Sequence, residues 1–221
     1  MSRILVVSPH PDDETLGAGG YLLKHKALGD SLYWLNITDM REEYGYSKER
    51  CEIRKHEMIR VKKAYGFVNM YNLRLKPAAL DTYDKGLLVE LVSKVLYDVK
   101  PQIVILPNYK DVHSDHKITF EVAYSCTKAF RHASIEQILC MEILSETDYA
   151  VCEDGFLPNY FVNIEQYIKE KIDIANTYIS EMGEMPFPRS AKALEALAIT
   201  RGAASNCKAA EAFKIVKVIE R

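Results

Sequence analysis

Apolar residues form two different patterns along the first 145 residues, and each pattern predicts one kind of secondary-structure element. Continuous apolar runs are typical of strands buried on both faces of a parallel sheet. Apolar residues three or four positions apart, bounded by serine, aspartate or glycine, are typical of amphipathic helices. The predicted strands are 3–8, 31–38, 68–75, 102–108 and 137–144. The predicted helices are 16–28, 47–65, 84–99 and 114–130.

Strand and helix alternate in this order, which predicts an α/β fold. We expect a doubly wound, mostly parallel sheet with helices on both faces. The expected strand order is 3-2-1-4-5, with right-handed crossovers between parallel strands.

The alternation of predicted strands and helices is less regular after residue 145. A short strand is expected at 157–164, followed by helices around 168–179 and at 191–200. No linker separates these segments from the rest. We therefore expect one domain over residues 1–221, in which a C-terminal extension, 146–221, completes the substrate pocket of the core, 1–145.

Composition limits the possible binding partners and the cellular compartment of the protein. The formal charge is −2 and no block of lysine or arginine is present. This argues against nucleic acid as a partner, because phosphate binding requires concentrated positive charge. The five cysteines form no CxxC pair, as expected for thiols in a reducing compartment. No apolar run has membrane-spanning length. We expect a cytoplasmic protein with no membrane span; the sequence leaves open whether it is a homo-oligomer.

The segment HPDDE, directly after the first predicted strand, gathers ligand-type side chains. Pro11 keeps His10 out of helical geometry, so His10 and Asp13 can face the same point. Imidazole and carboxylate are both good zinc ligands. The adjacent carboxylates of Asp12 and Asp13 repel each other unless positive charge or a donor offsets them. A divalent metal ion would do so, helped by the positive end of the following helix.

A second motif, DVHSDH, follows the strand 102–108. In the expected order the first and fourth strands are neighbours, and ligands bind outside their carboxyl ends. The fold then brings His116 to His10 and Asp13. Three protein ligands with an open position for water are the arrangement of a catalytic zinc site. Because the ligands are nitrogen and oxygen atoms, Fe²⁺ and Co²⁺ are alternatives to Zn²⁺.

Some of these residues have simpler interpretations. Asp12 or Asp13 could be a helix N-cap, and the glycines of LGAGG could allow a helix to pack closely on a strand. Arg54 lies on the apolar stripe of its helix and needs a partner there, either an acidic side chain or a hydroxyl or phosphate of a substrate. Arg201 could be a surface residue at the end of a helix.

Three segments resemble the signatures of the LmbE/PIG-L family of zinc-dependent N-acetylglucosaminyl deacetylases: PHPDDETLGAGG, DVHSDH and, at 201–213, RGAASNCKAAEAF. The resemblance spans nearly the whole chain. It implies a Rossmann-like fold, a Zn²⁺ cofactor and a hydrolase that removes an N-acetyl group from a small-molecule sugar conjugate. Asn206 and Ala209 replace a glycine and a tyrosine usual in the third motif, so the identity of the conjugate stays open.

The same resemblance implies roles for single residues. The metal ligands would be His10, Asp13 and His116. The catalytic residues would be Asp12, as general base, and His113, which would stabilise the oxyanion. The substrate-binding residues would be Arg54 and Arg201.

Two further carboxylates are expected to support the site. Asp111 could hold His113 protonated and oriented. Glu14 could orient a metal-bound histidine, or it could favour the start of the helix. Either Asp12 or His113 could protonate the leaving amine.

Two rival functions use parts of the same pattern. A nucleotide-binding module would use LGAGG, but Gly17, Gly19 and Gly20 do not match the GxGxxG spacing, and Asp39 would have to bind the ribose. A non-catalytic zinc- or sugar-binding protein would have no use for a second carboxylate at Asp12.

Overall fold

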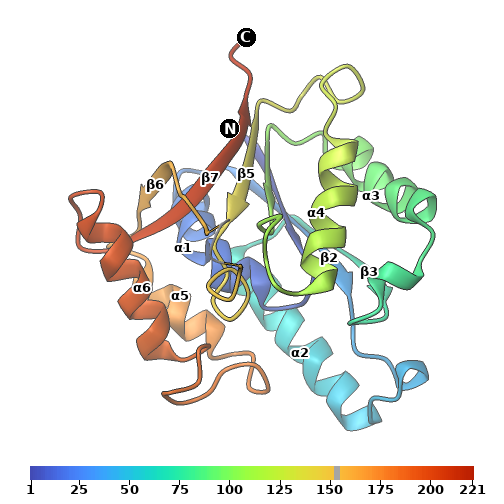
Figure 1. Ribbon diagram of the computed structural model, residues 1–221, viewed down its shortest axis with the longest axis horizontal. Helices are drawn as coiled ribbons and strands as arrows, with labels where there is room; N and C mark the ends of the chain where they lie inside the picture. Colours follow the sequence, from blue (N-terminus) through green and yellow to red (C-terminus); the bar gives the residue numbers. More distant parts are fainter. Residues whose placement is uncertain (152–154) are drawn as a thin grey trace.

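The computed structural model describes residues 1–151 and 155–221, which form helices around one seven-stranded sheet (Figure 1). The strands are β1 (Arg3–Ser8), β2 (Ser31–Thr38), β3 (Asn69–Leu75), β4 (Ile103–Leu106), β5 (Gln137–Met141), β6 (Tyr160–Asn163) and β7 (Ala210–Val218). The α-helices are α1 (Asp13–Ala27), α2 (Lys48–Tyr65), α3 (Lys85–Val99), α4 (Ser114–Cys126), α5 (Ile168–Ala175) and α6 (Ala191–Ala203). Two single 3₁₀ turns are η1 (Glu42–Tyr44) and η2 (Leu80–Thr82).

The sheet order is β3-β2-β1-β4-β5-β7-β6. The first five strands pair in parallel in the predicted order, which is confirmed. β7 pairs antiparallel with β5 and β6, so the C-terminal residues continue the same sheet. The sequence pattern predicts β6 but not β7. In β7 the four buried residues are consecutive, and lysines interrupt the residues that follow them. The segment therefore shows neither a long apolar run nor an alternation of apolar and polar residues.

Helices cover both faces of the sheet, as expected. One apolar core contains Ile4 and Val6 of β1 together with residues of α1, α2, α5 and α6. The opposite core contains Leu5 and Val7 with residues of α3 and α4. Successive residues of β1 enter opposite cores, which is why the strand is apolar throughout. Figure 1 shows α3 and α4 on one side of the molecule and α5 and α6 on the other.

Helix α1 packs very closely on its neighbours through its glycines. A Cβ atom at Gly17 would lie 2.8 Å from the Met141 side chain, and one at Gly20 would lie 2.7 Å from Ile164. The packing interpretation of LGAGG is therefore correct at these two positions. The contact holds the start of α1 against the end of β5.

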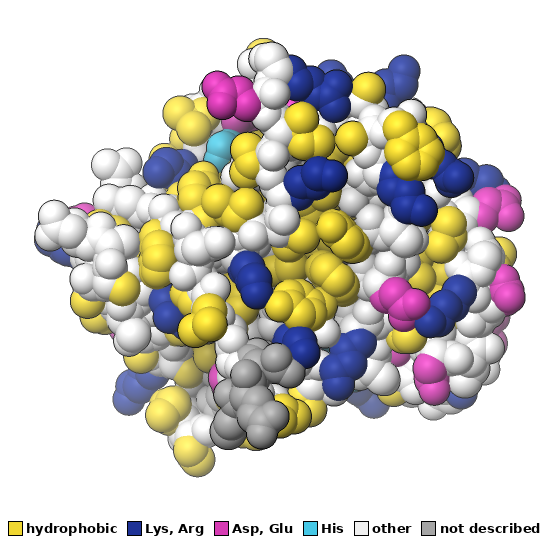
Figure 2. Space-filling view, turned by 45° about the horizontal axis from the view of Figure 1, so that its top comes forward, with side chains coloured by type: hydrophobic (Ala, Val, Ile, Leu, Met, Phe, Trp, Pro, Cys, Tyr) yellow, Lys and Arg dark blue, Asp and Glu magenta, His cyan; other side chains and the backbone are white. Residues whose placement is uncertain are grey.

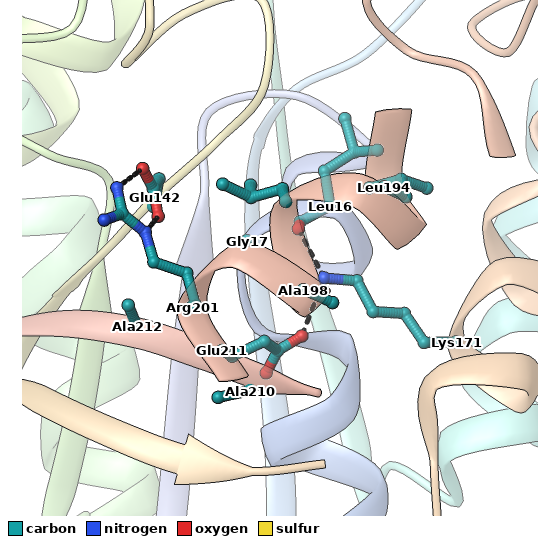
Figure 3. A pocket seen from close by; sticks show the side chains of 11 residues that line it. Leu16, Gly17, Glu142, Lys171, Leu194, Ala198, Arg201, Ala210, Glu211 and Ala212 are labelled. Carbon is teal, nitrogen blue, oxygen red and sulfur yellow. Dashed lines mark hydrogen bonds and ion pairs between the residues drawn. The ribbon is translucent and has the colours of Figure 1, made fainter. Parts of the chain in front are cut away.

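A buried ion pair from the C-terminal residues contacts the backbone of α1 (Figure 3). Lys171 Nζ donates to the carbonyl of Leu16 at 2.8 Å and to Glu211 Oε1 at 2.7 Å. The carboxylate of Glu211 accepts the N–H groups of Gly20, at 2.8 Å, and Tyr21, at 2.6 Å. The carbonyl of Leu16 and the N–H of Gly20 bond to each other in a regular helix. The ion pair therefore ties α1 to α5 and β7.

The surface mixes charged and apolar side chains. On the face in Figure 2, lysines and arginines are spread among hydrophobic side chains and form no single block. Among the described residues, no helix is long and apolar enough to cross a membrane. Four cysteines are free thiols: Cys51, Cys126, Cys140 and Cys207. Cys152 lies outside the described residues.

The buried ion pair makes a stability prediction. Lys171→Met should lower the free energy of unfolding by about 3–5 kcal/mol, because it leaves the carboxylate of Glu211 buried without its counter-charge. Denaturant unfolding measures the loss. The matched control is Lys208→Met. Lys208 forms an exposed ion pair with Glu165, so this change should leave the unfolding midpoint unchanged. Equal midpoints for the two variants would contradict a structural role for Lys171.

Candidate metal centre

The two histidine motifs meet at the carboxyl ends of β1 and β4. These strands are hydrogen-bonded neighbours, so the loop after β1 and the loop after β4 lie at the same edge of the sheet. The ring centroid of His10 lies 5.3 Å from that of His116 and 4.6 Å from that of His113. The convergence expected from the strand order is present in the structure.

Asp13 lies between the two imidazoles predicted as metal ligands. Its Oδ2 is 3.4 Å from His10 Nδ1 and 3.4 Å from His116 Nε2. One ligand-type atom from each of the three residues lies within 4.8 Å of the other two. Asp13 and His116 are buried, whereas 21% of the His10 side chain is exposed. One ion could reach all three residues, with His10 on the solvent side.

The cluster fits a cation by its charges as well as by its shape. Burial lowers the pKa of His116, but Asp13 and Asp111 outweigh that effect and raise it to about 10. Hydrogen bonds to Asp115 and Asp13 likewise raise the pKa of His10 to about 9 against its burial. His116 Nε2 is buried and has no hydrogen-bond partner among the described residues. The donor atoms are two imidazole nitrogens and a carboxylate oxygen, a set that suits Zn²⁺.

Each of the two histidines predicted as metal ligands is held by its own carboxylate. Asp111 Oδ2 lies 2.8 Å from His116 Nδ1, and Asp111 Oδ1 accepts the Thr147 hydroxyl at 2.7 Å. The expectation that Asp111 orients His113 is therefore wrong: the five-residue spacing to His116 lets its carboxylate reach that ring instead. A carboxylate on the second ring nitrogen fixes the tautomer that presents Nε2 to a metal.

The partner of His10 is Asp115, which the sequence analysis missed. Asp115 Oδ2 lies 3.1 Å from His10 Nε2, and the carboxylate also accepts the N–H groups of Ala78, at 2.6 Å, and Leu80, at 3.1 Å. Asp115 stands in DVHSDH between the two histidines. Its position inside the motif was the available signal, but its partner lies 105 residues away.

Asp12 lies beside the cluster but outside it. It precedes α1 with a backbone φ of 149°, a strained value for a residue other than glycine. Its Oδ2 accepts Arg189 Nη1 at 3.1 Å. Burial, followed by the charges of Asp13 and Glu181, raises the pKa of Asp12 well above its ordinary value. The N-cap interpretation of Asp12 holds for its place in the helix, but its side chain makes no capping hydrogen bond.

His113 caps α4 and also faces the cavity. Its Nδ1 accepts the backbone N–H of Asp115 at 3.0 Å, so a neutral ring carries its proton on Nε2. Burial, with the charges of His10 and His116, lowers the pKa of His113 to about 4. The expectation that a carboxylate keeps this ring protonated is therefore not met. His113 is a neutral hydrogen-bond donor near the cluster.

Among the described residues, the hydrogen bonds of Glu14 go to groups other than histidines. Its carboxylate accepts the hydroxyls of Thr15, at 2.7 Å, and Tyr178, at 2.8 Å, and the backbone N–H of Asp12, at 3.1 Å. The alternative interpretation, a role at the start of the helix, agrees with these contacts.

A cavity of about 290 Å³ opens next to the cluster. The residues that line it come from the end of β2, from α2, from the loops after β1, β2, β3 and β4 and from the C-terminal extension: His10, Pro11, Asp12, Thr38, Asp39, Met40, Tyr46, Arg54, Pro77, Ala78, His113, Glu146, Glu181 and Arg189. Sequence reasoning missed Glu181 and Arg189, because both lie between the expected helices 168–179 and 191–200, in a segment to which the sequence analysis gave no role.

The two predicted substrate-binding arginines are placed differently. Arg54 lines the cavity, but it is buried and its guanidinium is bound by protein: to the carbonyl of Pro11 at 2.6 Å, to Glu57 and to Glu181. These contacts agree with the alternative in which acidic side chains of the protein are the partners of Arg54. Arg201 does not line this cavity; it forms an ion pair with Glu142 in a separate, smaller depression (Figure 3).

Comparisons with known proteins agree with this geometry. The family model described as "PIG-L: GlcNAc-PI de-N-acetylase" matches residues 5–127. A probable N-acetyl-alpha-D-glucosaminyl L-malate deacetylase 2 of Bacillus subtilis (strain 168) is 24% identical over 162 residues, 66% of this chain and 73% of that protein. The diacetylchitobiose deacetylase of Thermococcus kodakarensis is 24% identical over 235 aligned positions, which cover 98% of this chain and 84% of the relative.

A solved structure shows the same fold. The conserved protein TT1542 from Thermus thermophilus superimposes with a TM-score of 0.79 at 24% identity, over 100% of this chain and 97% of the other. The predicted Rossmann-like fold is thereby confirmed. The family model covers more than half of this chain and includes both histidine motifs that meet at the cluster. The chain therefore belongs to the PIG-L (LmbE-like) family.

Proposed function

We propose that this protein is a divalent-metal-dependent hydrolase that removes the N-acetyl group from a sugar conjugate of the N-acetylglucosamine type. One observation carries the proposal: His10, Asp13 and His116 converge on one point at the edge of a cavity, with the separate carboxylate of Asp12 beside them. The similarity to deacetylases of N-acetylglucosaminyl malate and diacetylchitobiose supports the sugar substrate.

The predicted ligands His10, Asp13 and His116 would hold the metal. When bound, a Zn²⁺ ion supplies a Lewis acid for the amide oxygen and lowers the pKa of water to about 7. Fe²⁺ and Co²⁺ suit the same nitrogen and oxygen donors.

Asp12 is proposed as the general base. It lines the cavity, and Asp13 rather than Asp12 lies between the two ligand histidines. The raised pKa of Asp12 suits a group that must take up a proton from water near neutral pH. The two neighbouring carboxylates thus divide the work: Asp13 binds the ion and Asp12 accepts the proton.

His113 is proposed to stabilise the oxyanion. Its Nε2–H is free to donate, because Nδ1 already accepts a backbone N–H. A neutral, preoriented donor next to the site of charge development lowers the barrier without reorganisation. Asp12, once protonated, can return the proton to the leaving amine.

The rest of the chain is proposed to complete a single deacetylase domain over 1–221, in which 146–221 supplies Glu181 and Arg189 to the pocket. Substrate contact by Arg54 requires exchange of one of its present partners. Arg201 could contact only a part of the substrate that extends beyond the cavity. A cytoplasmic location agrees with the free cysteines.

The proposed base gives the first functional prediction. Zinc-loaded wild-type protein should release free amine from at least one member of a panel of N-acetylated sugar conjugates. Asp12→Asn should lower kcat about 10²–10⁴-fold, because it removes the proton acceptor. It should bind zinc as the wild type does. Unchanged hydrolysis by a zinc-loaded Asp12→Asn variant would refute the mechanism.

The proposed ligands predict metal dependence. His116→Ala should abolish both zinc retention after dialysis and amine release, because a three-ligand site loses one of its donors. Metal content by mass spectrometry and the amine assay measure the two effects. His56→Ala, a change at an exposed position of α2, is the matched control and should retain zinc. Stoichiometric zinc in His116→Ala would place the metal elsewhere.

The contact between Asp111 and His116 predicts a partial loss of zinc affinity when Asp111 is changed. Asp111→Asn should weaken zinc affinity about 10–100-fold, since the ring loses the acceptor that holds its tautomer. Competition with a chromogenic chelator measures this affinity. Glu14→Gln should leave it unchanged, because Glu14 instead binds Thr15, Tyr178 and the backbone of Asp12. A larger loss for Glu14→Gln than for Asp111→Asn would reverse the assignment.

A further inference from the structure

We propose that Arg189 is a positioning residue that holds the carboxylate of Asp12 turned toward the cavity and away from the metal position. This inference rests on the proposed function, because it concerns the base of that reaction. It starts from one contact: Arg189 Nη1 lies 3.1 Å from Asp12 Oδ2, although the two residues are 177 positions apart.

The contact is the end of a chain of alternating charges that begins on α2. Glu57 pairs with Arg54 at 3.0 Å, and Arg54 pairs with Glu181. Glu181 Oε2 lies 3.3 Å from Arg189 Nη1, which in turn binds Asp12. The backbone N–H of Ile179 also donates to Glu57 at 2.9 Å, so the loop that carries Glu181 is anchored on α2.

Asp12 is held from two sides by this chain. Arg54 Nη1 donates to the carbonyl of Pro11 at 2.6 Å, which fixes the backbone immediately before Asp12. Arg189 fixes the carboxylate itself through Oδ2. In the described part of the chain, Oδ1 of Asp12 has no protein donor, so this oxygen is available to a water molecule in the cavity. The arrangement selects which oxygen serves as the base.

Asp12 needs this restraint because of its surroundings. Its neighbour Asp13 and the nearby Glu181 are both carboxylates that repel it. A divalent cation at the cluster would attract it and offer a fourth ligand position. The strained backbone φ of 149° does not by itself determine where the side chain points. Arg189 offsets the repulsion between Asp12 and Glu181, and it competes with the cation for Asp12.

Removal of Arg189 should therefore have two linked effects. Asp12 would turn toward the cation, which would tighten metal binding, and it would no longer be placed to accept a proton, which would slow the reaction. A residue that only bound substrate would change neither the metal affinity nor kcat in this way.

The experiment compares Arg189→Ala, Arg189→Lys and the exposed control Arg60→Ala on the zinc-loaded full chain. For Arg189→Ala we expect kcat to fall about 10- to 100-fold, a part of the about 10²–10⁴-fold that a general base contributes, with KM within about threefold of wild type. Guanidinium ion at a non-denaturing concentration should restore part of kcat. Arg189→Lys should retain more activity than Arg189→Ala, because a point charge still reaches Asp12.

A second measurement does not depend on activity. Chelator competition should show several-fold tighter zinc binding by Arg189→Ala than by wild type, and the increase should vanish in Arg189→Ala/Asp12→Asn. Arg60→Ala should match the wild type in both measurements. Similar melting temperatures for Arg189→Ala and Arg60→Ala exclude general unfolding as the cause.

Two results would overturn the inference. One is a rise in KM with kcat and zinc affinity unchanged, which would make Arg189 a substrate-binding residue. The other is wild-type behaviour of Arg189→Ala in kcat, KM and zinc affinity. If wild-type protein hydrolyses none of the conjugates, the proposed function fails, and the zinc-affinity comparison still tests the position of Asp12.

Discussion

The site depends on the contact of the buried Asp13 carboxylate with the imidazoles of His10 and His116, between which it lies. A negative charge with little access to water requires positive charge close by. Two histidines with raised pKa values meet that requirement in the protein alone, and a divalent cation would meet it in the loaded enzyme. Asp111, Asp115 and Asp12 are arranged around this contact, the first two behind the rings and the third beside them.

The fold brings these groups together by strand order. β1 and β4 are adjacent, and the loops after them carry one motif each. Helix α1 begins at Asp13 itself, so the position of this proposed ligand depends on how firmly α1 is held. Its glycines pack against β5 and the loop after β6, and the pair formed by Lys171 and Glu211 binds its backbone. The C-terminal residues of α5 and β7 thus support a proposed ligand at the other end of the chain.

The sequence predicts the part of this structure that local pattern and topology determine. The parallel strands read as apolar runs, and their order follows from the alternation of strands and helices. That order places HPDDE against DVHSDH. The contacts made by long-range side-chain geometry were not predictable: Asp111 reaches His116 rather than His113, and Asp115 reaches a histidine in the other motif. Arg189 comes from a loop whose path is set by ion pairs with α2, and no local pattern encodes those.

The proposed metal position can be tested by a crystal structure of the zinc-loaded protein, with anomalous scattering recorded on both sides of the zinc absorption edge. We expect one zinc peak bound by His10, Asp13 and His116, with Asp12 outside the coordination sphere and in contact with Arg189. A zinc peak away from these three residues, or one that includes Asp12 as a ligand in the wild-type protein, would contradict this expectation.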